Sequence, residues 1–365
     1  MRIKKSDQLK LKTFLKLFFV CLAVFILLFL CLLWSLGAEN DGDYEVVVTE
    51  PVIFKRHDVV VAVVACGDRF EETMTMLKSA LMFTKIHLSF LVVSDDHLID
   101  RFKEKLEQWK TATKNRFSYR VVPLTFPVVE VEEWKKLFKL CASQRLFLPE
   151  VLKDVDSVLY MDTDTLFLTP VEDVWDHFYK MNSSQMAALA PEHEEPNVAW
   201  YNRFAKHPYY GKLGVNSGVM LMNLTKMRKF RWKEYVVPIY KKFKLKITWG
   251  DQDIINIIFH YHPDKLYIYS CRYNFRPDHC MYNSVCKPAE KEGVAVLHGS
   301  RGFFHSDKQP VFKAIYQAVE EFNLGTDSKQ IFLQTLETYL EERKNTNCGH
   351  VKDIFLKNLR NYMER

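Results

Sequence analysis

Residues 157–164 read SVLYMDTD, an apolar run of strand character that ends in two aspartates separated by one residue. In an extended chain, residues i and i+2 project to the same side, so Asp162 and Asp164 are expected to lie together. Two adjacent carboxylates repel each other unless a cation lies between them, and a hard divalent ion binds such oxygens as well as phosphate oxygens. The stretch therefore indicates a strand that ends in a metal site. The alternative is a turn in which Asp162 caps the chain and Asp164 is solvated.

The chain before this stretch alternates between strand and helix patterns. Residues 59–65 are valine and alanine throughout, which is typical of a strand buried on both faces. The alternation predicts an α/β fold with a mostly parallel central sheet and helices on both faces, whose ligands bind beyond the carboxyl ends of the strands. Asp68 and Glu71 resemble a capping box for the first helix. The expected strands are 59–65, 87–93, 120–124 and 157–161. Three helices are expected between and after them: one that begins near residue 70, one that ends near residue 109, and one over about 130–148.

The N-terminal region predicts a membrane anchor. Residues 17–36 form an uncharged apolar run of about twenty residues, the length that crosses a bilayer as a helix. Basic residues precede the run and acidic residues follow it, so residues 1–16 are predicted to be cytosolic and the rest luminal. The alternative is a cleaved signal peptide, but residues 36–38 match a cleavage site poorly.

The remaining organisation follows from composition. Residues 37–57 are polar and acidic and suit a short stem, residues 58–325 form the folded domain, and residues 326–365 read as terminal amphipathic helices. Residues 181–213 read as a long insertion near the site. The net charge of +6 does not indicate nucleic-acid binding, because many of the positive charges lie at the extreme N-terminus.

A luminal location has consequences for asparagine and cysteine. Asn182 and Asn223 begin N-x-S/T sequons and become candidate N-glycosylation sites, Asn223 being the weaker one because a buried strand is expected beside it. The sequence does not determine how the late cysteines pair, although Cys280 and Cys286 are close enough to close a small loop. We interpret Cys66 and Cys141 as buried free thiols. The disulfide candidates are Cys271, Cys280, Cys286 and Cys348.

Three further motifs carry polar residues at element ends. Residues 294–297 form a short apolar strand that delivers His298, which could complete an Asp, Asp, His site for a manganese-like ion, although alone it would suit a buried core. The following Gly299 would let the backbone approach phosphates, and Arg301 could bind them bidentately. Asp251 and Gln252 open a helix; either they face a substrate or Asp251 is merely an N-cap.

The strand at 215–223 carries Asn216 at its mouth. Its Gly218 allows another backbone or a ligand to approach closely, and the alternative is a strand with a bulge.

In this order, the motifs DTD (162–164), NSGVMLMN (216–223), GDQD (250–253) and HGSRG (298–302) resemble the retaining glycosyltransferases of family eight. Residues 138–149, 190–211 and 276–280 are similar to the glucoside xylosyltransferases of animals. The resemblance spans about residues 58 to 320 and implies the GT-A fold, a Rossmann-like nucleotide-diphospho-sugar transferase fold.

The resemblance also implies an activity. It is the transfer of xylose with retention, in α-1,3 linkage, from UDP-xylose to O-linked β-glucose on EGF-like repeats of proteins such as Notch. Mn²⁺ or Mg²⁺ would be the cofactor, and the protein would be a single-pass type II protein of the endoplasmic reticulum or Golgi. The alternatives are a hexosyltransferase that uses UDP-glucose or UDP-galactose, a silent luminal binding protein, and a metal-dependent phosphohydrolase, which would need more acidic ligands.

Site residues follow from the resemblance, motif by motif. Asp251 and Gln252 match the positions nearest the anomeric carbon, and an amide at Gln252 favours front-side attack over a covalent intermediate. Whether Arg301 or Lys308 grips phosphate is open, because a Lys-Pro-Trp ending found in many members is displaced here. An acceptor protein would meet the aromatic residues near Trp200 and Tyr201. The implied metal ligands are Asp162, Asp164 and His298, and the implied donor-binding residues are Ala65, Cys66, Gly67, Arg69, Arg145, Asp162, Thr163, Asn216, Gly218, Gly299 and Arg301.

Overall fold

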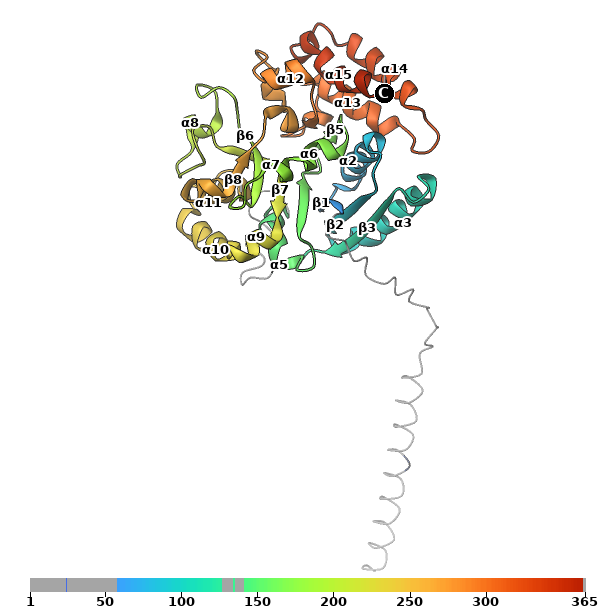
Figure 1. Cartoon of the computed structure of the whole chain (residues 1–365). Coiled ribbons are helices and arrows are strands. Elements are labelled where there is room, and N and C mark those ends of the chain that lie inside the picture. Colours follow the sequence, from blue (N-terminus) through green and yellow to red (C-terminus); the bar gives the residue numbers. More distant parts are fainter. Residues whose placement is uncertain (1–23, 25–57, 127–133, 135–140, 364–365) are drawn as a thin grey trace, which may run out of the picture. The chain divides into compact units, whose positions relative to one another are not determined.

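Buried strands organise the structure, a computed structural model that describes Val24, residues 58–126, Trp134 and residues 141–363 (Figure 1). The predicted tail, membrane span and stem lie outside the described residues apart from Val24, as does most of the segment 127–140. No helix within the described part of the chain is long and apolar enough to cross a membrane.

The main sheet has seven strands in the order β3-β2-β1-β4-β7-β6-β8. β1 pairs in parallel with β2 and β4, and every residue of β1 and β2 is buried, as expected for central parallel strands. Only β7 runs antiparallel to its neighbours in the described sheet. The predicted α/β fold with a mostly parallel sheet is therefore confirmed. The strands are β1 (Val59–Ala65), β2 (Leu88–Ser94), β3 (Phe117–Pro123), β4 (Ser157–Met161), β6 (Ala187–Pro191), β7 (Val215–Asn223) and β8 (Leu266–Ile268).

Helices pack against this sheet along its length. α2 contacts β1, α3 contacts β3, and α11 contacts β7. The C-terminal helices are amphipathic as predicted, and Phe332 of α14 packs edge-on against Phe83 of α2. The longer helices are α2 (Phe70–Phe83), α3 (Asp96–Ala112), α10 (Trp232–Phe243), α11 (Asp251–Tyr261), α13 (Pro310–Glu321), α14 (Lys329–Glu341) and α15 (Asp353–Met363).

A second, two-stranded sheet joins distant parts of the chain. We call residues 162–164, which carry Asp162 and Asp164, the acidic turn. β5 (Thr165–Phe167) follows it directly and pairs antiparallel with β9 (Val296–His298). In this register Thr165 lies opposite His298, so the histidine is delivered beside the two aspartates.

Two local predictions about helices were wrong. The start of α2 carries no side-chain cap, so Asp68 and Glu71 form no capping box; Glu71 instead pairs with Arg101 at 2.6 Å. The described end of the predicted 130–148 helix is a 3-10 helix (Ala142–Phe147) followed by the short α5 (Leu148–Val151). A long α-helix cannot continue there because Cys141, just before it, has a left-handed backbone with φ of 65°.

The segment 181–213 is only in part an insertion. Its residues 187–191 are β6, a strand of the main sheet, and β6 is followed by α8 (Trp200–Phe204). Alanine and leucine fill this buried strand, so its pattern lacked the β-branched residues that mark the others.

Disulfides connect three pairs of cysteines. Cys271 pairs with Cys286 and Cys280 pairs with Cys348, so all four candidates are confirmed, and Cys280 does not close a loop with Cys286. The interpretation of Cys66 and Cys141 as free thiols was wrong, because they form a disulfide across 75 residues of sequence. It ties the carboxyl end of β1 to the 3-10 helix that carries Arg145.

We predict that replacing Cys66 and Cys141 together by serine lowers the free energy of unfolding by about 2–4 kcal/mol, because the cross-link restricts the unfolded chain. Urea denaturation of the purified protein measures the loss. Labelling of both thiols in unfolded, unreduced wild-type protein would contradict the disulfide.

Candidate active site

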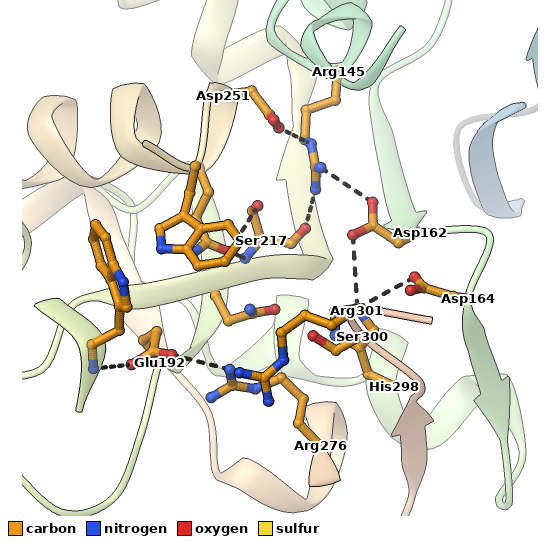
Figure 2. A pocket seen from close by; sticks show the side chains of 14 residues that line it. Arg145, Asp162, Asp164, Glu192, Ser217, Asp251, Arg276, His298, Ser300 and Arg301 are labelled. Carbon is orange, nitrogen blue, oxygen red and sulfur yellow. Dashed lines mark hydrogen bonds and ion pairs between the residues drawn. The ribbon is translucent and has the colours of Figure 1, made fainter. Parts of the chain in front are cut away.

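The acidic turn after β4 gathers three ligand atoms. His298 Nε2 lies 3.4 Å from Asp164 Oδ1 and 3.9 Å from Asp162 Oδ2 (Figure 2). Asn274 Nδ2 donates to Asn216 Oδ1, so its carbonyl oxygen faces His298 Nδ1 at 2.8 Å. Nδ1 must then carry the proton, which leaves the Nε2 lone pair directed at the carboxylates. Two carboxylates and one imidazole suit a divalent ion such as Mn²⁺.

Gly218 makes room for this cluster. A Cβ atom at Gly218 would lie 2.2 Å from His298 Cε1 and 3.0 Å from Asp162 Oδ2. Its carbonyl oxygen accepts from the backbone N–H of Asp162 at 2.8 Å. The absence of a side chain at Gly218 therefore leaves room for His298 and Asp162. Asn216, on the same strand, lines a cavity described below.

A buried arginine connects the turn to α11. Arg145 Nη2 lies 3.1 Å from Asp162 Oδ1, and its Nε lies 2.5 Å from Asp251 Oδ2. Its Nη1 donates to the Ser217 carbonyl oxygen. Burial disfavours the cation, but Asp162 and Asp251 outweigh it and raise the pKa of Arg145. The arginine expected to contact a donor is thus already held by three protein groups.

Two cavities meet at the acidic turn. The first has an empty volume of about 690 Å³, and the second has about 1040 Å³. Both are lined by Arg145, Asp162 and Asp164, so the ligand cluster lies at their junction. The second cavity is completed by residues at the ends of β1 and β4, in the 3-10 helix and in the loop after β9. They are Val64, Cys66, Gly67, Asp68, Arg69, Ala142, Tyr160, Thr163 and Gly302.

This arrangement agrees with the comparisons to known proteins. The model of the family described as "Glycosyl transferase family 8" matches residues 60–299. The chain belongs to glycosyl transferase family 8. It is 53% identical over 309 residues to glucoside xylosyltransferase 1 of Rattus norvegicus, covering 82% of this chain and 71% of the relative. It is 51% identical over 315 residues to glucoside xylosyltransferase 2 of Mus musculus, covering 83% and 71%. The predicted resemblance is confirmed.

Solved structures confirm the fold. Mouse xyloside xylosyltransferase 1 in its apo form has a TM-score of 0.51 at 20% identity, covering 67% of this chain and 98% of that one. The galactosyltransferase LgtC, in complex with donor and acceptor sugar analogs, has a TM-score of 0.55 at 18% identity, covering 74% and 98%. At these identities the likeness concerns the fold alone, and it supports the predicted GT-A fold.

In this family 8 chain, α11 presents Asp251 and Gln252 to the first cavity. Asp251 is not the N-cap, which is Gly250; its side chain faces Arg145, and burial raises the pKa of Asp251 to about 6. Gln252 Oε1 accepts from the Ser217 backbone N–H at 3.1 Å, and its Nε2 donates to the Tyr201 hydroxyl at 3.2 Å. The amide is therefore fixed in orientation at the cavity wall.

The residues that follow His298 differ in their contacts and in their exposure. Gly299 donates its N–H to the Asp164 carbonyl oxygen at 2.7 Å and holds the loop on the turn. Arg301 lines the first cavity but binds both oxygens of Asp278, at 2.7 and 2.6 Å. Lys308 is exposed on the segment before α13. Ala65 is fully buried at the end of β1, directly before the two residues that line the second cavity.

Sequence reasoning missed Glu72, a buried carboxylate in the first turn of α2. One of its oxygens accepts from Thr163 Oγ1 at 2.7 Å, and the other lies 2.8 Å from Arg69 Nη1 and 2.9 Å from His305 Nε2. It links three segments that surround the second cavity. Nothing in the spacing distinguishes Glu72 from its neighbour Glu71.

Reasoning from the sequence also missed part of the wall of the first cavity. Glu192, Trp249 and Arg276 lie there, and Glu192 forms an ion pair with Arg276 at 3.1 Å. Glu192 and Arg276 lie in stretches 190–211 and 276–280, whose resemblance was noted, but the sequence assigned neither of them a role.

We predict that Arg145→Met lowers the free energy of unfolding by about 3–5 kcal/mol, because two carboxylates lose their buried partner. Adding Asp251→Asn should recover part of the loss, since one uncompensated charge disappears. Chemical denaturation measures both. Arg120→Met, which removes a pair to the half-exposed Asp154, is the matched control and should cost about 1 kcal/mol or less. Equal losses in the Arg145 and Arg120 variants would refute the role of Arg145.

Proposed function

We propose that this chain transfers xylose with retention, in α-1,3 linkage, from UDP-xylose to a β-linked glucose. The observation that carries the proposal is the position of Asp162, Asp164 and His298 where the cavity at the end of β1 meets a smaller polar one. The names of the relatives at 51–53% identity supply the donor and acceptor sugars.

Mn²⁺ or Mg²⁺ would be held by Asp162, Asp164 and His298, and it would supply Lewis-acid stabilisation of the leaving diphosphate. The uridine would lie at the end of β1, against Cys66, Gly67 and Arg69. Gly67 is held there because its N–H donates to Asp95 Oδ2 at 2.8 Å. The sugar would lie between Asn216, Asp251 and Gln252.

The contacts of the carboxylates favour front-side attack. A covalent route needs a carboxylate or another nucleophile free to approach the anomeric carbon. Among the described residues that line the first cavity, Asp251 is engaged by Arg145, and Glu192 by Arg276 and the backbone N–H of Trp200. Gln252, an amide, can stabilise positive charge through its oxygen while Asp251 orients donor hydroxyls.

The acceptor and the location are further parts of the proposal. The acceptor is O-linked glucose on EGF-like repeats of proteins such as Notch, and the protein is a type II membrane protein of the endoplasmic reticulum or Golgi. Three disulfides suit an oxidising lumen. Asn182 is exposed and suits N-glycosylation, whereas Asn223 caps α9 (Leu224–Lys229) through its side chain. Protease protection of a C-terminal tag in intact vesicles tests the orientation.

The proposal is tested by measuring UDP release and product formation with UDP-xylose, UDP-glucose and a β-glucoside acceptor. We expect UDP-xylose to be preferred, chelation to abolish transfer and Mn²⁺ to restore it. Asp164→Ala should lose transfer because a ligand oxygen is removed. Preference for UDP-glucose would remove the xylose assignment. Full activity of Asp164→Ala would remove the metal site, and rapid UDP release without acceptor would favour a hydrolase.

Gln252→Ala should keep the fold and the UDP affinity but lose turnover roughly a hundredfold or more, because a transition-state interaction is removed. Steady-state kinetics and UDP titration measure the two properties separately. A variant with near-normal turnover would show that Gln252 only begins a helix, and a trapped glycosyl adduct on Asp251 or Gln252 would refute front-side attack.

A further inference from the structure

One part of the wall of the first cavity is built from separate segments. Glu192 follows β6, Trp200 begins α8, Trp249 precedes α11, and Arg276 follows the loop after β8. Figure 2 shows Glu192 and Arg276 well apart from Asp251 and Arg145. The three possible metal ligands and the three groups that hold Arg145 are other residues of the described chain.

Two indole rings form a corner on this wall. The rings of Trp200 and Trp249 have centroids 5.5 Å apart and an angle of 74° between their planes. Both side chains are partly buried and line the cavity, in contrast to Trp134 and Trp232, which are 1% exposed within the core. Covering the core therefore does not account for the position of this pair.

Buried hydrogen bonds fix the corner. Asp253 Oδ2 accepts from the backbone N–H groups of Thr248 and Trp249 at 2.7 and 2.8 Å, and its Oδ1 accepts from the Tyr201 hydroxyl at 2.8 Å. Tyr201 is the neighbour of Trp200 in α8. One fully buried carboxylate thus holds the backbone at Trp249 and, through the Tyr201 side chain, the helix that carries Trp200.

Two charged side chains, Glu192 and Arg276, lie next to Trp200. Glu192 Oε2 accepts from the Trp200 backbone N–H at 3.2 Å, and Glu192 Oε1 pairs with Arg276 Nη1. Arg276 is 3% exposed, and its Nε and Nη2 have no hydrogen-bond partner within the described residues. An oxygen-rich ligand on this wall would supply acceptors for such donors.

The combination fits one chemical class. All hydroxyl groups of a β-glucopyranose are equatorial, so its faces carry axial C–H groups that pack on aromatic rings, while its edge carries hydroxyl groups for charged partners. The donor sugar would lie against Asn216, Asp251 and Gln252, because its diphosphate would bind at the acidic turn, so the four wall residues named above are left for a second sugar.

We infer that Trp200, Trp249, Glu192 and Arg276 form the subsite for the acceptor sugar, a β-linked glucose. The two indoles hold its apolar face, and Glu192 and Arg276 bind its hydroxyl edge. This assignment rests on the proposed function, since it takes the second sugar to be a β-glucoside.

Kinetics of Trp200→Ala and Trp249→Ala with p-nitrophenyl β-glucoside and UDP-xylose test the subsite. We expect the acceptor KM to rise about tenfold or more, and the KM for UDP-xylose to change by less than about twofold. The phenylalanine variants should lie in between, because a smaller aromatic face remains. Trp109→Ala, on α3, is the matched control and should change neither KM. An unchanged acceptor KM in both alanine variants, or an equal rise in both KM values, overturns the assignment.

A binding measurement separates this inference from the proposed function. Saturation-transfer NMR of methyl β-glucoside in the presence of UDP and Mn²⁺ reads the subsite without turnover. A signal in wild type that is lost in Trp249→Ala supports the subsite even if xylose proves not to be the donor. Absence of a signal in wild type, or equal signals in both proteins, overturns the subsite even if xylose is transferred.

Discussion

The guanidinium of Arg145 is the charge on which the rest of the site depends. It lies between Asp162, at the end of β4, and Asp251, at the start of α11, and without it the buried Asp251 carboxylate would face the partly buried Asp162 carboxylate with no cation between them. The disulfide from Cys66 holds the start of the segment that carries Arg145 against β1. Under the proposed function, this cation supplied by the protein would allow one aspartate to bind metal while the other orients sugar hydroxyls.

The register of the β5–β9 pair determines the position of His298, the third possible metal ligand. His298 reaches Asp164 because β9 pairs with β5, which begins one residue after the acidic turn. The ring then occupies space that Gly218 leaves open on β7. The ligand set therefore uses three strands from two sheets, and a shift of one residue in the β5–β9 register would move His298 to the other face.

Sequence reasoning succeeded where chemistry lies at strand ends. The turn at Asp162 and the cavity residues at Gly67 follow from buried strands whose ends share one edge of a sheet. It failed where partners are distant in sequence. Cys66 bonds to Cys141 across 75 residues, and Glu192 pairs with Arg276 across 84. No local pattern encodes such pairs, because only the folded chain brings the segments together.

The Tyr201 hydroxyl joins the aromatic wall to the reaction centre. Burial raises its pKa well above the usual value, so it stays protonated, and its single proton goes to Asp253. Toward Gln252 it can then only accept, which forces Nε2 of Gln252 to face Tyr201 and turns Oε1 toward Ser217. The amide oxygen is thereby set at the cavity wall before any substrate binds. The helix that carries Trp200 and the group that would stabilise charge on the donor sugar are fixed by the same hydrogen bonds, so their separation does not depend on substrate.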